Sequence, residues 1–326
     1  MKRVLVTGAN GFIGTMLCKK LLHENFRVHG TVRPGKTSLL PEGVEPVHIE
    51  SIDGNTDWKN TLEGINMIVH LAARVHIMDD IASDASSAYR HVNVAGTDLL
   101  SRMGAASGCT RFVFMSSIKV NGEERAKPYS ERDMPAPLDP YGISKWEAEQ
   151  KLIEVAKKTR MELVILRPPL VYGPGVKANF LRLIKIVDHG FPLPLASVNN
   201  RRSLIYLGNL VDAIITCLVH PKAAGETFMV SDNMDLATSE LIRLMVEAMS
   251  RKARLFSFPP RLLKIIGKIT GRSSEINRLI DSLCVDSSKI RTMLGWNPTY
   301  TLAEGIHETI EWYLKSADHF STIFRT

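Results

Sequence analysis

The chain has 326 residues, 44% of them hydrophobic and 23% charged, with a formal net charge of +7 at pH 7. This balance is typical of a globular protein with one large or two modest domains, and it excludes a disordered chain. The sequence has no run of about 18 uncharged apolar residues and no signal-peptide core, so we expect no membrane span and a cytoplasmic location.

Cysteine spacing and charge narrow the function classes further. Cys18, Cys109, Cys217 and Cys284 are too far apart for a metal knuckle or a CxxC pair, which predicts reduced core thiols and no metal site. The positive charge suits an anionic small substrate as well as nucleic acid. Because no RNA- or DNA-binding motif is present, we expect no nucleic-acid partner.

Short β-rich runs alternate with helix-length segments through the first half of the chain. This alternation is typical of a parallel sheet with helical crossovers. The runs are almost continuously apolar because both faces of such a sheet are covered. The predicted strands cover residues 3–7, 27–32, 67–73, 111–117 and 162–168.

The alternation of β-rich runs and helix-length segments ends after residue 169, where prolines become frequent. We therefore predict an α/β fold in which a Rossmann-type, doubly wound parallel sheet occupies residues 1–169. A smaller substrate-binding domain occupies residues 170–326. The two are partly interleaved, with elements near 203–220 returning to the sheet.

The stretch TGANGFIG at 7–14 lies between the first predicted strand and a predicted helix at 12–22. Backbone N–H groups at a helix N-terminus attract pyrophosphate, and glycine allows it to approach closely. Gly8, Gly11 and Gly14 form GxxGxxG, one residue longer than the usual dinucleotide fingerprint. Alone, this spacing is also compatible with a tight turn that binds nothing.

A second motif, YGISK, places Tyr141 and Lys145 four residues apart in a segment of helical composition. Both side chains then project from one helix face, and an ammonium group one turn away lowers the pKa of the phenol. Ser116 and Ser117 end a predicted central strand and could donate hydrogen bonds to a substrate oxygen. An isolated YxxxK would indicate only a surface helix, but its combination with the glycine turn favours a hydride-transfer site.

TGANGFIG, HLAA at 70–73, the Ser116–Ser117 pair, YGISK and RPPLVYGPG at 167–175 resemble the extended short-chain dehydrogenase/reductase family. The similarity is greatest to its nucleotide-sugar epimerase, dehydratase and reductase branch, also named the NAD-dependent epimerase/dehydratase family. It extends over nearly the whole chain, to DSSKIRTMLGWNP at 286–298. It implies an enzyme with a nicotinamide cofactor and a nucleotide-sugar substrate.

The resemblance implies roles for individual residues. Tyr141 would be the acid/base, Lys145 its partner and a ligand of the nicotinamide ribose, and Ser117 the hydroxyl that orients the sugar. Ser117 is preferred to Ser116 by counting back from VNG at 120–122. Besides Tyr141 and Lys145, the implied cofactor contacts are Gly8, Asn10, Gly11, Phe12, Ile13, Gly14, Arg33, Ile52, Asp53, Leu71, Ala72, Ala73, Asn93 and Pro168.

The second predicted strand bears on the choice between NAD and NADP. NAD-specific relatives have an Asp there that binds the ribose hydroxyls and repels a 2′-phosphate. Here HGTVRPGK at 29–36 has no carboxylate, and Arg33 could instead pair with that phosphate. We therefore expect NADP rather than NAD, although Arg33 could also be a solvated loop charge.

Two departures from relatives bear on the reaction. Nucleotide-sugar 4,6-dehydratases have Asp-Glu after the catalytic hydroxyl, where this chain has Ile118 and Lys119, which disfavours dehydration. The absent Asp favours a 4-ketoreductase over a 4-epimerase that keeps NAD bound. SSIKVNGE at 116–123 and NRRSLIYLGNLVDAI at 200–214 also look like bacterial polysaccharide-cluster proteins, among them reductases similar to UDP-N-acetylquinovosamine dehydrogenase.

The leading hypothesis is thus reduction of a UDP-4-keto-6-deoxy-N-acetylhexosamine, with a UDP-hexose or UDP-N-acetylhexosamine 4-epimerase as the alternative. A reductase of neutral ketones and a non-catalytic dinucleotide-binding protein remain as further rivals. The resemblance implies that Asn179 and Arg202, and more weakly Arg278, contact the sugar's diphosphate, with Ser116 and Ser117 at the sugar. Each could instead be a surface residue. The family habit of pairing through two helices implies a homodimer.

RLLKIIGKITGR at 261–272 is basic and amphipathic. It is compatible with a helix that lies on an anionic membrane, giving weak membrane-surface contact. The preferred interpretation is a helix that covers the substrate pocket and keeps its lysines in water.

Overall fold

The computed structural model describes residues 1–75, 85–125 and 127–323. A parallel sheet of seven strands, in the order β3-β2-β1-β4-β5-β6-β9, forms its centre. Sequence order reverses between β1 and β4, the position at which such sheets bind ligands. The strands are β1 (Arg3–Thr7), β2 (Arg27–Val32), β3 (Glu45–His48), β4 (Met67–His70), β5 (Arg111–Met115), β6 (Glu162–Arg167) and β9 (Thr227–Met229).

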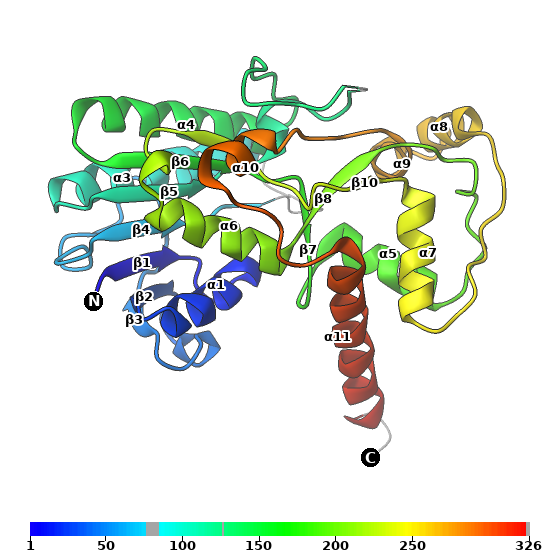
Figure 1. Ribbon diagram of the computed structural model, residues 1–326, viewed down its shortest axis with the longest axis horizontal. Coiled ribbons are helices and arrows are strands. Elements are labelled where there is room, and N and C mark those ends of the chain that lie inside the picture. Colours follow the sequence, from blue (N-terminus) through cyan, green and yellow to red (C-terminus); the bar gives the residue numbers. More distant parts are fainter. Residues whose placement is uncertain (76–84, 126, 324–326) are drawn as a thin grey trace.

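Helices cover both faces of this sheet (Figure 1). On one face α1 (Phe12–His23), α6 (Leu207–Val219) and α10 (Ser288–Leu294) share a hydrophobic core with the sheet. On the other face, α3 (Thr97–Ala106) and α4 (Pro140–Lys158) pack through Leu100, Ala148 and Leu152. The helix α2 (Ala85–Tyr89) and a π-helical turn (Arg90–Gly96) precede α3.

The rest of the chain builds a second hydrophobic core around a small sheet of order β10-β8-β7. Its strands are β7 (Leu170–Tyr172), β8 (Arg202–Tyr206) and β10 (Asp235–Leu236). The helices here are α5 (Ala178–Asp188), α7 (Thr238–Ala248), α8 (Pro260–Ile269), α9 (Ser273–Ile280) and α11 (Leu302–Ile323). Figure 1 shows them gathered beside the large sheet.

The predicted doubly wound Rossmann fold is confirmed. The predicted strands at 67–73 and 111–117 end earlier, at His70 and Met115, because the chain turns out of the sheet there. Of the elements expected to return near 203–220, α6 packs on the large sheet, whereas β8 belongs to the small one. Two returning elements were not predicted: β9 extends the large sheet beside β6, and α10 packs nearby.

Candidate active site

The glycine turn after β1 forms a tight cradle. Gly8 has φ of +69°, and its N–H donates to Oγ1 of Thr31 on β2 at 3.0 Å. A Cβ on Gly14 would lie 2.1 Å from the Gly8 carbonyl oxygen, so only glycine allows α1 to begin this close to β1.

The N-terminus of α1 is free of local anions. Gly11 is its N-cap, no side chain caps it, and its first turn holds no acidic residue. The first-turn N–H groups therefore offer their partial positive charge to an external anion. This cradle fits the pyrophosphate of a dinucleotide.

A buried polar chain holds the neighbouring strand end against this turn. The hydroxyl of Thr7 accepts from the N–H groups of Leu71 and Ala72, at 3.1 Å each. With both lone pairs used, it donates its proton to Nδ1 of His70, 2.7 Å away. Nε2 of His70 therefore carries the ring proton and donates to Thr97, 2.9 Å away. Burial lowers the pKa of His70 to about 3.

This buried imidazole makes stability depend on pH. The unfolded chain protonates His70 near pH 6.5 and the folded chain only near 3, so stability is lost as pH falls through this window. Between about pH 7.5 and 5.5, we expect His70 alone to remove roughly 1.4 kcal/mol from the free energy of unfolding. Urea unfolding at both pH values checks this, and His70→Gln should lack that part of the loss. An equal loss in both proteins would contradict it.

The tyrosine and lysine of YGISK lie in the first two turns of α4. Asp139 caps this helix, its Oδ1 accepting from the N–H of Gly142 at 2.6 Å. Burial, followed by the nearby Asp139, raises the pKa of the Tyr141 phenol above its ordinary value. A hydrogen bond with Ser117 opposes only part of this rise. The expected lowering of the Tyr141 pKa is therefore not found in the protein alone.

Lys145, four residues after Tyr141 on α4, is buried. Its ammonium donates to the Met115 carbonyl at 2.7 Å and lies 4.5 Å from the centre of the Phe114 ring. Burial lowers its pKa to about 7, partly opposed by Glu149 one turn further along α4. Lys145 can thus exist in either protonation state near neutral pH.

Glu149 anchors a buried ion pair beneath the site. Its carboxylate pairs with the Arg167 guanidinium of β6 through hydrogen bonds of 2.9 and 2.5 Å, and both side chains are almost wholly buried. Ser116 donates its hydroxyl to the same carboxylate. Arg167 also donates to Oδ1 of Asn121 at 3.0 Å. The pair and Ser116 thus join α4 to β6 and to the end of β5.

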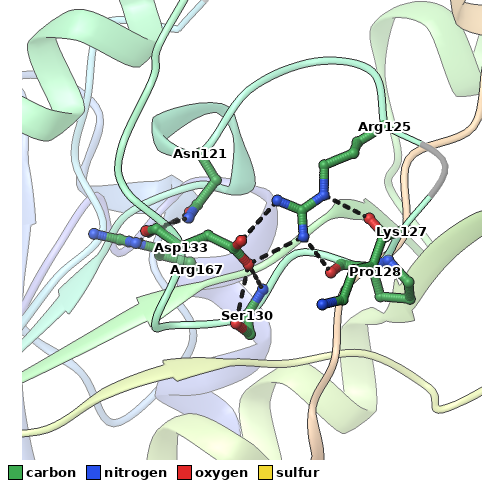
Figure 2. Close-up of polar contacts among 7 residues, drawn as sticks. All are labelled: Asn121, Arg125, Lys127, Pro128, Ser130, Asp133 and Arg167. Atoms are coloured by element: carbon green, nitrogen blue, oxygen red, sulfur yellow. Dashed lines mark hydrogen bonds and ion pairs between the residues drawn. The ribbon is translucent and has the colours of Figure 1, made fainter.

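The segment between Ser117 and Tyr141 is closed by its own network (Figure 2). Arg125 donates to both carboxylate oxygens of Asp133, at 2.7 and 3.2 Å, and to two backbone carbonyls. Ser130 donates to the same carboxylate through its N–H and its hydroxyl. These contacts hold the pKa of Asp133 well below its usual range. The network fixes the chain that joins the serine to the tyrosine.

A cavity of about 380 Å³ opens beside Ser117 and Tyr141. Asn179, Arg202 and Arg278, from the second half of the chain, line it as well. The remaining wall is largely aliphatic. Its leucines are Leu170, Leu183, Leu204, Leu236, Leu241, Leu279 and Leu283.

Two guanidinium groups meet in this cavity. Arg202 donates to the carbonyl of Asp281 at 2.9 Å. Burial lowers its pKa, and the cation of Arg278 lowers it too. Two cations that repel one another in a largely apolar cavity are suited to an anion between them.

Most of the implied cofactor residues share one edge of the large sheet, because they follow the carboxyl ends of its strands. Asn10 and Gly11 are exposed in the turn, Phe12 and Ile13 are half-buried, and Arg33 is exposed just after β2. Leu71, Ala72 and Ala73 follow β4, and Pro168 follows β6. Ile52 and Asp53 follow β3, where Oδ2 of Asp53 accepts from the Ser51 hydroxyl at 2.5 Å.

Two implied residues serve the scaffold in the structure. Asn93 is buried and bonds both backbone groups of Arg74, at 2.8 and 3.0 Å, and the Ser144 hydroxyl at 2.9 Å. It ties the loop after β4 to α4. Ser116 was expected at the sugar, but its hydroxyl points to Glu149 and it does not line the cavity. Successive residues of an extended chain point to opposite sides, so only Ser117 reaches the cavity.

The sequence motifs did not identify Asp139 as a cavity residue, nor its ion pair with Lys119. The Lys119 ammonium pairs with the Asp139 carboxylate, and both line the cavity. Asp139 followed by Pro140 is an N-cap signal that could have marked the helix start.

The basic segment at 261–272 forms most of α8 and the turn that follows it. No residue of this segment lines the cavity. The next lining residues along the chain are Arg278 and Leu279, which belong to α9. The expectation that it covers the substrate pocket is wrong, since α9 lies in that place.

Within residues 1–75, 85–125 and 127–323, no helix is long and apolar enough to cross a membrane. The same part of the chain contains no group of three or more His, Cys, Asp or Glu side chains arranged to hold a metal ion. The four cysteines, all described, are buried free thiols.

Known nucleotide-sugar enzymes resemble this chain over nearly its whole length. The chain is 42% identical over 322 residues to a UDP-glucose 4-epimerase of Vibrio cholerae, covering 97% of this chain and 96% of the relative. It is 27% identical to N-acetyl-alpha-D-glucosaminyl-diphospho-ditrans,octacis-undecaprenol 4-epimerase of Escherichia coli O157:H7, covering 95% and 94%.

A solved structure, that of UDP-glucuronic acid 4-epimerase from Bacillus cereus in complex with NAD, shares the fold. Its TM-score is 0.77 at 24% identity, with 96% of this chain and 99% of that chain covered. Residues 4–231 match the model of the NAD dependent epimerase/dehydratase family. The chain is therefore an enzyme of the NAD-dependent epimerase/dehydratase family, within the extended short-chain dehydrogenases/reductases.

Proposed function

We propose that the protein is a 4-epimerase of a UDP-hexose or UDP-N-acetylhexosamine that works with bound NAD. The observation that carries the proposal is the single cavity that joins Ser117 and Tyr141 to Asn179, Arg202 and Arg278. An anionic diphosphate between the arginines leaves the sugar within reach of the tyrosine. A neutral ketone would make no use of the paired cations.

The side chains suit proton transfer at a sugar hydroxyl. Tyr141 takes the proton of the C4 hydroxyl and later returns it, and Ser117 holds the same oxygen. Lys145, with its pKa lowered to about 7, stabilises the phenolate when protonated. The glycine turn at the start of α1 would hold NAD, which would supply the hydride chemistry needed at C4, taking up the hydride and returning it to the opposite face. The aliphatic wall offers few hydrogen bonds to the sugar ring. This supports a keto sugar that rotates in the cavity between hydride removal and hydride return.

Identity to the V. cholerae UDP-glucose 4-epimerase supports epimerisation over the 4-ketoreductase expected first. The family's description as NAD-dependent supports NAD over NADP. Ile118 and Lys119 at the cavity leave no carboxylate pair at the place that dehydratases use.

One observation favours the ketoreductase as a second candidate. Arg33 is exposed immediately after β2, with no carboxylate beside it in the stretch 29–36. A ketoreductase of UDP-4-keto-6-deoxy-N-acetylhexosamine would use this cation for NADPH. Arg33→Ala tests the assignment, because NADPH binding should then weaken by about 1 to 3 kcal/mol more than NADH binding. An epimerase that keeps NAD should be nearly indifferent to the change.

The deciding experiment incubates the purified protein with UDP-glucose or UDP-N-acetylglucosamine and no added cofactor, and separates the product by chromatography. Formation of the 4-epimer supports the proposal. Inactivity there, with oxidation of NADPH on addition of UDP-4-keto-6-deoxy-N-acetylglucosamine, would make the enzyme a ketoreductase. We extend the proposal to a homodimer in the cytoplasm, because members of the family dimerise through two helices and the sequence predicts a cytoplasmic location.

Arg278→Ala is expected to weaken binding of the diphosphate without affecting the fold, because Arg278 is only half-buried. Loss of one charge-assisted contact should raise the Kd for UDP by roughly 10- to 100-fold, measured by calorimetry. Arg272→Ala is the matched control, since it removes an exposed cation of the same region that does not line the cavity. Equal effects of the two variants would remove Arg278 from the site.

A further inference from the structure

The helix α8 exposes its most apolar face to solvent. Leu263 and Gly267 are buried, and the backbone at Gly267 lies close to Ile276 of α9. The opposite face carries Leu262, Ile265, Ile266 and Ile269, with exposed fractions of 45, 52, 43 and 79%. These four residues have the spacing i, i+3, i+4, i+7, so they form one continuous stripe. Figure 1 places α8 at the outer end of the second half, away from the large sheet.

Cations surround this stripe. Residues 251–280 contain eight Lys and Arg but only one acidic residue, Glu275, a surplus equal to the +7 of the whole chain. Arg251 pairs with Asp188, and Lys264 pairs with Asp281. The exposed cations of α8 and its C-terminal turn are Arg261, Lys268 and Arg272.

We propose that α8 docks the protein onto an anionic lipid bilayer. The α8 surface, defined as Leu262, Ile265, Ile266 and Ile269 with Arg261, Lys268 and Arg272, combines the two features of interfacial helices. Its aliphatic stripe enters the boundary of the acyl chains, and its cations remain among anionic headgroups. A second copy of this chain would bring the same three exposed cations of the α8 surface against its own, so charge complementarity favours anionic lipid as the occupant.

The docking has a consequence for the cavity. α8 packs on α9, and α9 contributes Arg278 and Leu279 to the cavity wall. Lys264 of α8 also pairs with Asp281, whose carbonyl accepts from Arg202. Binding through the α8 surface therefore holds this wall of the cavity close to the headgroups.

The test is co-sedimentation of the full-length protein with vesicles. One set is phosphatidylcholine alone, and the other contains about one-third phosphatidylglycerol. We expect sedimentation with the anionic vesicles only, and less of it at high salt. Ile265→Asp with Ile269→Asp should abolish it. Lys268→Glu with Arg272→Glu should reduce the partition coefficient at least 25-fold, since each cation contributes about fivefold.

Lys59→Glu with Lys222→Glu is the matched control, because it makes the same charge change at exposed sites in other elements. It should keep most of the binding, and all variants should keep the wild-type melting temperature. The proposal is overturned if the wild type ignores anionic vesicles, or if the α8 variants bind as the control does. It is equally overturned if the α8 variants change only the mass of the particle in light scattering, which would make the stripe a contact between copies.

Discussion

Replacing Tyr141 by Phe should lower kcat by roughly 10²- to 10⁴-fold, the range that a positioned proton donor and acceptor contributes. The phenol lies in the cavity wall beside Ser117, and burial raises its pKa, so no solvent base replaces it easily. Because the change removes one oxygen atom, binding of the cofactor and of UDP should stay close to that of the wild type. Turnover of the UDP-sugar and calorimetric titration with UDP measure the two effects separately.

Tyr89→Phe is the control for this prediction. Its ring meets that of Tyr141 edge to face, with ring centres 6.3 Å apart, and its hydroxyl points to the Val75 carbonyl. It should therefore retain most of the activity. Comparable losses in the two variants would mean that packing of the rings, and not the proton on Tyr141, limits the reaction.

The strands and the glycine turn could be predicted because their causes are local. A buried parallel strand needs a continuous apolar run, and Gly14 has no room for a side chain beside Gly8. The YGISK pair was also readable, since a helical spacing of four puts two side chains on one face. The resemblance then named the implied cofactor residues, most of which the structure brings to one edge of the large sheet.

The remaining errors concern contacts made across the fold. Ser116 and Ser117 are chemically identical, and only the direction of their side chains distinguishes them. The Ser116 hydroxyl points to Glu149, whereas Ser117 lines the cavity. The fall in the Tyr141 pKa was expected from the Lys145 ammonium one helical turn away, but burial of the phenol raises this pKa instead. Whether α8 could cover the cavity depended on whether α9 occupied that part of the wall. No local sequence pattern contains that information.

The buried Glu149–Arg167 pair predicts the largest effect on stability. Glu149→Gln leaves the Arg167 guanidinium without its counter-ion in a site where the arginine side chain is only 6% exposed. Breaking such a pair from one side should cost about 3 to 5 kcal/mol of the free energy of unfolding, measured by urea denaturation. Adding Arg167→Met should recover part of this loss, because the unpaired charge is then removed.

Arg111 and Glu162 provide the matched comparison, since they form the same kind of pair between β5 and β6. There the glutamate is 45% exposed, so water replaces it and Glu162→Gln should cost no more than about 1 kcal/mol. Similar losses from Glu149→Gln and Glu162→Gln would contradict the prediction. Glu149→Gln should also lower the pKa of Lys145 further, because the Glu149 charge raises it in the wild type. A shift of the pH–activity profile toward acid, in the fraction that remains folded, would then tie this pair to the proton transfer at Tyr141 and not to stability alone.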